Sequence, residues 1–158
     1  MSVFKFLVVD DQSPEFSVAL RYAGLRARAI KGEVVILSLI QTSRFAHWMS
    51  ISEELRAEAV AEARAAASGH IAFLAELAGV QAELALAESD LKAAIKSVLE
   101  ADPAIRAIVL AAAPGRGGPG PLVSSLGKGG LGGRPVAVVV IPGDLSPEAV
   151  DELAGLTG

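Results

Sequence analysis

The chain has 158 residues, of which 52% are hydrophobic and 20% charged, and this composition excludes a disordered polypeptide and predicts a single domain over residues 1–158. Its net charge of −4 does not favour a nucleic-acid partner, and the absence of cysteine excludes disulfides and thiolate metal sites. No apolar run approaches the roughly 20 residues that span a bilayer, and the first residues do not resemble a signal peptide, so we expect a cytoplasmic protein without membrane contact.

Apolar runs and helical repeats alternate along the whole sequence. Runs rich in β-branched residues and too short for helices predict buried strands, at residues 3–10, 34–40, 80–86, 105–112 and 136–141. The expected helices are residues 13–31, 50–78, 90–102, 122–131 and 146–153. Strands separated by helices pair in parallel through right-handed crossovers. The order therefore predicts a five-stranded parallel sheet sandwiched by helices, in the Rossmann-like α/β class, with the strand at 80–86 near an edge.

Capping residues mark where the helices begin. Ser13-Pro14-Glu15 and Ser146-Pro147-Glu148 each offer an N-cap, a proline at the first helical position and an acid in the first turn. Ser50-x-x-Glu53 is a capping box, and Ser89 or Asp90 caps the following helix.

One apolar stripe runs along the helix at 50–78, from Ile51 and Leu55 to Leu74, and is expected to face the sheet. His70 lies in the same helix. His47 is interpreted as a packing or loop residue, because no second histidine and no acid or cysteine cluster lies nearby in sequence. His70 is the only other histidine, which argues against a metal site built on a histidine pair.

The glycine-rich stretch after the fourth strand is the leading candidate for a ligand site. The N–H groups of Gly115, Gly117 and Gly118 can approach a phosphate closely because glycine has no Cβ. Ligands of open α/β sheets bind beyond the strand C-termini, where the strand order reverses. If the first and fourth strands are neighbours, Asp10-Asp11 and this loop face one crevice. The alternative is a flexible surface loop.

Three other motif interpretations fit less well. Gly115-x-Gly117-x-x-Gly120 matches the dinucleotide fingerprint in its letters, but only one strand remains after it. A Walker A motif fails because Gly127-Lys128 is followed by glycine instead of serine or threonine. The pair Asp10-Asp11 resembles the start of a receiver domain, but the aspartate expected after the third strand is missing, and Asp90 is better explained as a helix cap.

A different resemblance covers nearly the whole chain. The opening LVVDDQSPEFSVALRYA resembles the strand–Asp–x–Ser–helix start of the universal stress protein family in its UspA-like, nucleotide-binding form, and VVILSLI resembles that family's second strand. The string GPGPLVS resembles the loop of a bacterial branch of the family. The resemblance implies the UspA fold, an adenine nucleotide as ligand and a role in the stress response.

The resemblance also assigns roles to particular residues. It places Asp11 and Ser13 in the opening motif, where Asp11 would accept from ribose hydroxyls or hold magnesium, and Leu39 where the backbone reads adenine. The family's phosphate motif, G-x2-G-x9-G-[ST], is only partly present, because its first two glycines fall on Ala111 and Pro114 or on Ala112 and Gly115. The candidates for the ATP phosphates are Ala112, Gly115, Arg116, Gly117, Gly118, Ser124 and Ser125.

Catalysis is not expected beyond slow ATP hydrolysis, because no Ser-His-Asp, Cys-His or paired-acid constellation is visible in the sequence. The strand at 136–141 is apolar on both faces from Val136 to Ile141, which predicts pairing with a second copy, and the resemblance implies a homodimer through this strand. Coverage of this edge by the last helix is the alternative. A dimerisation scaffold or partner-binding module that binds no nucleotide is the rival function.

Overall fold

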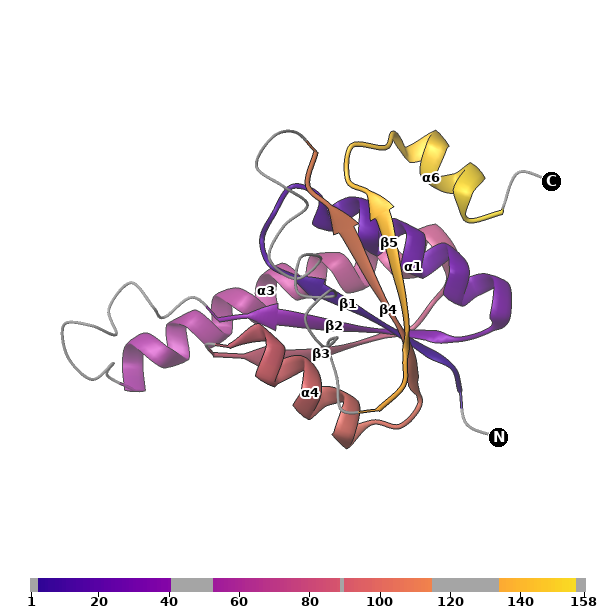
Figure 1. Ribbon diagram of the computed structural model, residues 1–158. Helices are drawn as coiled ribbons and strands as arrows, with labels where there is room; N and C mark the ends of the chain where they lie inside the picture. Colours follow the sequence, from indigo (N-terminus) through magenta and orange to yellow (C-terminus); the bar gives the residue numbers. More distant parts are fainter. Residues whose placement is uncertain (1–2, 41–52, 89, 115–133, 156–158) are drawn as a thin grey trace.

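The computed structural model describes residues 3–40, 53–88, 90–114 and 134–155, which form one parallel sheet with helices packed on it (Figure 1). The strands are β1 (Lys5–Asp10), β2 (Glu33–Leu39), β3 (Ala82–Ala87), β4 (Ile105–Ala112) and β5 (Ala137–Pro142). The helices are α1 (Phe16–Ile30), α3 (Glu53–Ala78), α4 (Leu91–Ala101) and α6 (Pro147–Leu153). The predicted α/β class and its five-stranded parallel sheet are confirmed.

The strand order is β3-β2-β1-β4-β5, so the order reverses between β1 and β4. β1 is the central strand and pairs in parallel with β2 on one side and β4 on the other. The sequence left open whether the first and fourth strands are neighbours, and the sheet makes them so. The C-terminal ends of β1 and β4 therefore meet at the point where open α/β sheets bind ligands. β3 lies at an edge, as predicted.

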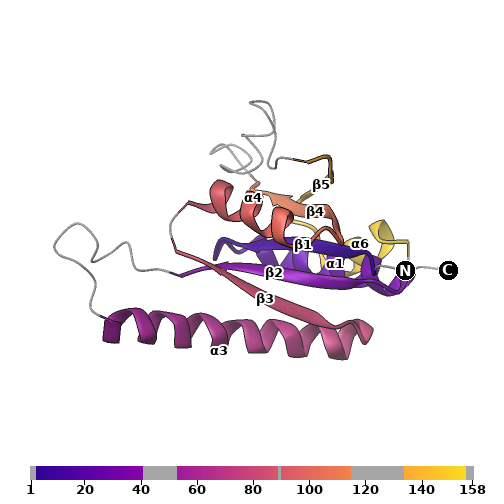
Figure 2. The same ribbon diagram turned by 90° about the horizontal axis from the view of Figure 1, so that it is seen from below.

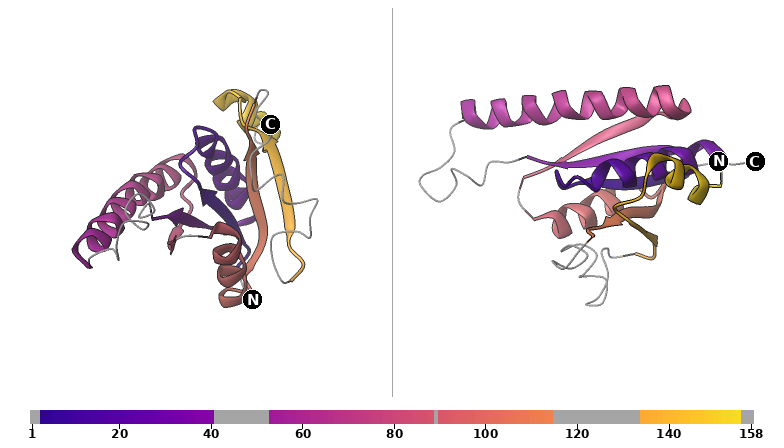
Figure 3. Two further views of the ribbon diagram at one scale, coloured as in Figure 1. Left: turned by 60° about the vertical axis from the view of Figure 1, so that its left-hand side comes forward. Right: turned by 90° about the horizontal axis from the view of Figure 1, so that it is seen from above.

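Helices cover both faces of the sheet (Figures 2 and 3). Alternate residues of the strands feed two core clusters, since side chains alternate between the faces of a strand. The first core cluster joins Phe6 and Val8 of β1 to α1 and to Leu74 of α3. The second core cluster joins Leu7 and Val9 to Ile95 of α4 and its neighbours. α6 packs against α1 at the side of this assembly.

Several helix ends were predicted correctly. Asp90 caps α4 by accepting from the Lys92 N–H at 3.0 Å, and Ser146 caps α6 by accepting from the Ala149 N–H at 3.2 Å. The start of α1 was predicted wrongly, because α1 begins at Phe16 and its N-cap is Glu15, which makes no side-chain hydrogen bond. Ser13 contributes its carbonyl instead, which accepts from the Phe16 N–H in a turn that precedes α1.

α3 differs from its prediction in burial. Ala67 and Leu74 are its buried residues, whereas Leu55 is 40% exposed, because the first turns of α3 extend beyond the ends of the strands (Figure 2). The expected stripe therefore contacts the sheet only in its second half. Ser50, His47 and the helix expected at 122–131 lie outside the described residues. Within the described ranges, no helix is both long enough and apolar enough to cross a membrane.

Candidate functional site

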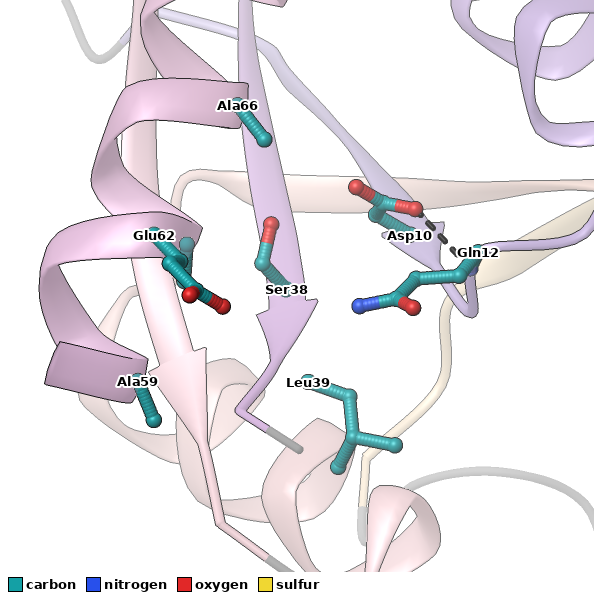
Figure 4. Close-up of a pocket in the computed structure, with 8 residues that line it drawn as sticks. Asp10, Gln12, Ser38, Leu39, Ala59, Glu62 and Ala66 are labelled. Carbon is teal, nitrogen blue, oxygen red and sulfur yellow. Dashed lines mark hydrogen bonds between the residues drawn. The ribbon is translucent and has the colours of Figure 1, made fainter. Parts of the chain in front are cut away.

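A cavity of about 350 Å³ opens at the C-terminal edge of the sheet, between the ends of β1 and β2 and the first half of α3 (Figure 4). Its volume lies within the range of small-molecule sites. The lining residues come from these three elements and the loop after β1: Asp10, Gln12, Ser38, Leu39, Ala59, Glu62, Ala63 and Ala66.

Strand register brings Asp10 and Ser38 together in this cavity. The two residues are direct partners in the parallel pairing of β1 with β2. Each lies two positions after a core residue of the first cluster, Asp10 after Val8 and Ser38 after Ile36, and so continues the same face of the sheet. The face that packs on α1 and α3 thus changes from apolar to polar at its C-terminal end.

Ser38 is buried, with 4% of its surface exposed, and its Oγ has no hydrogen-bond partner among the described residues. An unpaired buried hydroxyl costs about 1–3 kcal/mol, so native structures keep few of them. Figure 4 shows the Ser38 hydroxyl on the cavity side, between Glu62 and Asp10. A ligand bound in the cavity would supply the missing partner.

Asp10 is a buried carboxylate held from two directions. Its Oδ1 accepts from the Gln12 N–H at 3.0 Å, and its Oδ2 lies 3.6 Å from Nε2 of His70 on α3. The His70 ring packs edge-on against buried Phe16, with ring centroids 4.9 Å apart. His70 is therefore a packing residue that also contacts the cavity carboxylate.

The remaining lining residues give the cavity its shape and charge. Glu62 of α3 and Gln12 direct their side chains into the cavity, and alanines leave the α3 wall open (Figure 4). The carboxylates of Asp10 and Glu62 accept hydrogen bonds and repel anions. The cavity thus suits a ligand part rich in hydroxyl or amino donors, and a phosphate would have to lie outside it.

The predicted site residues that the structure describes all lie at the same edge of the sheet. Asp11 is exposed, and its Oδ1 accepts from the Ser13 N–H at 3.0 Å, so the two form one turn outside the cavity. Leu39 ends β2 and lines the cavity. Ala112 ends β4, and its carbonyl accepts from the Gly143 N–H at 2.9 Å. The other candidates, which are Gly115, Arg116, Gly117, Gly118, Ser124 and Ser125, lie outside the described residues.

Sequence reasoning missed several cavity residues. Asp10 and Gln12 flank the predicted Asp11, and the acidic pair Asp10-Asp11 was the signal in the sequence that could have found Asp10. Ser38 is the polar residue inside the apolar run VVILSLI, and a polar residue in a strand buried on both faces marks a place where the core is interrupted. Glu62 gave no signal, because acidic residues recur throughout the exposed surface of α3.

The described residues contain no group of three or more His, Asp or Glu side chains placed to hold a metal ion. A bound nucleotide can itself supply ligands to a cation. Magnesium in phosphate sites is held in this way, by one or two carboxylates and the phosphate oxygens.

No protein-family model matches the chain, and no curated protein matches it. Solved structures do. The universal stress protein UspA from Lactobacillus plantarum is 22% identical, with 89% of this chain and 99% of that chain covered and a TM-score of 0.68. The universal stress protein from Archaeoglobus fulgidus in complex with dAMP is 18% identical, with 89% and 99% covered and a TM-score of 0.61.

A universal stress protein in complex with cAMP is also similar, with 13% identity, 91% of this chain and 100% of that chain covered and a TM-score of 0.56. The parallel sheet, its order reversal and the cavity at its C-terminal edge define an α/β protein of the class that binds ligands at the strand ends. More specifically, the chain has the universal stress protein fold, and the resemblance seen in the sequence is confirmed for the fold.

Proposed function

We propose that this chain is a UspA-like stress-response protein that binds an adenine nucleotide, ATP, at the C-terminal edge of its sheet. The observation that carries the proposal is the cavity beside β1, in which the buried Ser38 hydroxyl has no partner among the described residues. Structures of the same fold in complex with dAMP and with cAMP support the choice of ligand.

The charges along the C-terminal edge of the sheet favour different places for the adenosine part and for the phosphates of the nucleotide. The acceptor-rich cavity with Asp10 and Glu62 suits the adenosine part, whose amino and hydroxyl groups donate. The phosphates then belong beyond the end of β4, with Ala112, Gly115, Arg116, Gly117, Gly118, Ser124 and Ser125 as the proposed contacts. Pairing of β1 with β4 supports this division, because it brings the C-terminal end of β4 next to the end of β1, which the loop with Asp11 follows.

Asp11 is proposed to accept from the ribose or to hold magnesium through the nucleotide, with Ser13 beside it. The residue fits this role, because its carboxylate is exposed and only its Oδ1 accepts a hydrogen bond within the described part of the chain. The nucleotide would supply its phosphate oxygens to the ion. We expect any hydrolysis of the bound ATP to be slow.

Isothermal titration calorimetry with ATP, ADP and AMP, in the presence of magnesium, tests the proposal. The unmodified protein should bind, and the double variant Asp11→Ala with Gly115→Val should lose binding. Glu76→Ala, which removes an exposed acid of α3 near the opposite end of the helix, is the matched control and should bind normally. Absence of binding to all three nucleotides at millimolar concentration would overturn the proposal.

In that case the second candidate function applies, a cytoplasmic dimerisation scaffold or partner-binding module. It is favoured by the position of β5 at an edge of the sheet, where Val140 is 39% exposed. α6 packs against α1, which argues against coverage of this edge by the last helix. A homodimer through residues 136–141 is proposed for both functions.

A further inference from the structure

Two non-glycine residues of the described chain have a positive φ, Gln12 at 62° and Lys31 at 57°. This conformation is strained for residues with a Cβ and is adopted readily by glycine. Lys31 ends α1, a common place for a left-handed residue. Gln12 follows β1 and lines the cavity, so its strain is located at the candidate site.

The loop is held in this conformation by two consecutive carboxylates. Oδ1 of Asp10 accepts from the Gln12 N–H at 3.0 Å, and Oδ1 of Asp11 accepts from the Ser13 N–H at 3.0 Å. As a result the Gln12 carboxamide points across the cavity toward Ser38 (Figure 4). The side chain of Gln12 makes no hydrogen bond within the described ranges, so both its donor and its acceptor are available to a ligand.

The opposite wall provides an independent sign of a ligand. Ser38 is 4% exposed, and its Oγ lacks a partner in the described structure. The Ser38 hydroxyl and the Gln12 carboxamide therefore line the same cavity from two sides (Figure 4). A ligand edge that carries a donor next to an acceptor would match the carboxamide, whose amino group donates and whose oxygen accepts.

We propose that Gln12 is a specificity-determining residue that selects adenine over guanine in the nucleotide of the proposed function, on which this inference rests. Adenine presents its N6 amino group beside the acceptor N7, and a glutamine carboxamide pairs with both at once. Guanine presents the acceptors O6 and N7 at the same edge, so the carboxamide oxygen is left facing an acceptor. The strained backbone positions the Gln12 carboxamide that contacts the base. Glycine would fit the backbone conformation but has no carboxamide to contact the base.

The test compares AMP and GMP binding by calorimetry for the unmodified protein, Gln12→Gly, Gln12→Met and Lys31→Gly. The unmodified protein should prefer AMP by about tenfold or more, the discrimination expected from one bidentate pair. Gln12→Gly and Gln12→Met should both reduce this preference to about twofold or less, given the loss of that pair. Lys31→Gly relieves the same backbone strain outside the cavity and should keep the full preference.

Thermal unfolding of the same variants distinguishes a role of Gln12 in recognising the base from a structural role. Gln12→Gly should unfold at a temperature no lower than the unmodified protein, as should Lys31→Gly, because glycine relieves the positive φ. If AMP binds but both Gln12 variants keep the preference, or if Gln12→Gly lowers the unfolding temperature while Lys31→Gly does not, the inference is overturned and the proposed function stands. If neither nucleotide binds the unmodified protein, both are overturned.

Discussion

Ser38 is the residue at which the requirements of folding and of ligand binding separate most clearly. Its hydroxyl is buried without a partner in the described part of the chain, at the end of a strand whose other inward side chains are apolar. A position selected for stability alone would favour an apolar residue there. The hydroxyl is therefore explained by a ligand better than by the fold.

Ser38→Ala should leave the free energy of unfolding unchanged or raise it by up to about 1 kcal/mol, because it removes an unsatisfied buried group. The same substitution should weaken ATP binding by roughly two- to tenfold, the effect of one hydrogen bond. Urea unfolding and calorimetry measure the two effects. Ser97→Ala, on the exposed side of α4, is the control for binding. A loss of stability in Ser38→Ala would mean that the hydroxyl has a partner within the protein.

Gly24 of α1 lies where α3 packs so closely that a larger side chain does not fit. A Cβ added at Gly24 would lie 2.5 Å from Cδ2 of Leu74, which is fully buried in α3, whereas a Cβ added at Gly69 would meet nothing within 4 Å. Helix propensity favours alanine at both positions by about 1 kcal/mol. Overpacking costs about 1–3 kcal/mol and should decide the outcome at Gly24.

We therefore expect Gly24→Ala to lower the free energy of unfolding by about 1 kcal/mol and Gly69→Ala to raise it by a similar amount. Urea unfolding of the two variants beside the unmodified protein measures both changes. The pair is matched, since each substitution adds the same methyl group to a helix. A stabilising effect at Gly24 would contradict the close contact between α1 and α3.

At the scale of elements, the position of α6 determines whether the edge strand β5 is covered. α6 is docked on α1 by a bidentate ion pair, in which Nε and Nη2 of Arg21 donate to the Asp151 carboxylate at 2.7 and 3.0 Å. Arg26 donates further to the carbonyl of Ala154 at 3.2 Å. The last helix is thereby held against α1, and β5 remains the edge strand.

Val140→Lys should convert the proposed homodimer into a monomer, because it places a charge on the exposed side of the edge strand. Val138 is the less suitable position, since it packs against the second core cluster and a lysine there would disturb the fold. Light scattering at high micromolar concentration measures the mass, and circular dichroism checks that the helices are intact. An unmodified protein that is monomeric at this concentration excludes the dimer.

At the scale of the whole molecule, one ionic cluster ties the N-terminal edge of the sheet together. Nζ of Lys5 on β1 lies 2.9 Å from Glu83 of β3 and 2.9 Å from Asp102, which follows α4. The guanidinium of Arg134 donates to the carbonyls of Leu99 and Asp102 beside it. Elements from both sides of the central strand are thus joined at the edge opposite the candidate site.

This cluster makes stability depend on pH. Burial alone would raise the pKa of Asp102, but hydrogen bonds from the Lys5 ammonium and the Ala104 N–H outweigh it and hold the pKa below its ordinary value. A carboxyl whose pKa is lower in the folded state stabilises the fold above its unfolded pKa of about 3.9, and this contribution is lost as the pH falls through the folded value.

Asp102→Asn should accordingly lower the free energy of unfolding by about 1 kcal/mol at pH 7, the order expected of a part-exposed ion pair. The difference from the unmodified protein should shrink as the pH falls below about 4. Urea unfolding at pH 7 and at acid pH measures it, with Glu100→Gln, an exposed acid of α4, as the control. A difference that stays constant with pH would contradict the role of the charge.

The sequence by itself determined the features that depend on neighbouring residues. β4 was predicted at its observed bounds, Ile105–Ala112, because Pro103 and Pro114 flank a run that is apolar except for Arg106. The caps at Asp90 and Ser146 were predictable because a side chain within three residues satisfies the free N–H groups of a helix start. The alternation of strands and helices then required a parallel sheet, and the likeness of its motifs pointed to the universal stress protein fold.

Only the tertiary structure decided which distant residues meet. The pairing of β1 with β2 places Asp10 beside Ser38, and the packing of α3 brings His70 to Asp10 and Glu62 to the cavity. Local periodicity gives the face of a strand but not its register against another strand, so the meeting of Asp10 with Ser38 could not be predicted. Register and helix position are set by long-range packing of the two core clusters, which no stretch of neighbouring residues encodes.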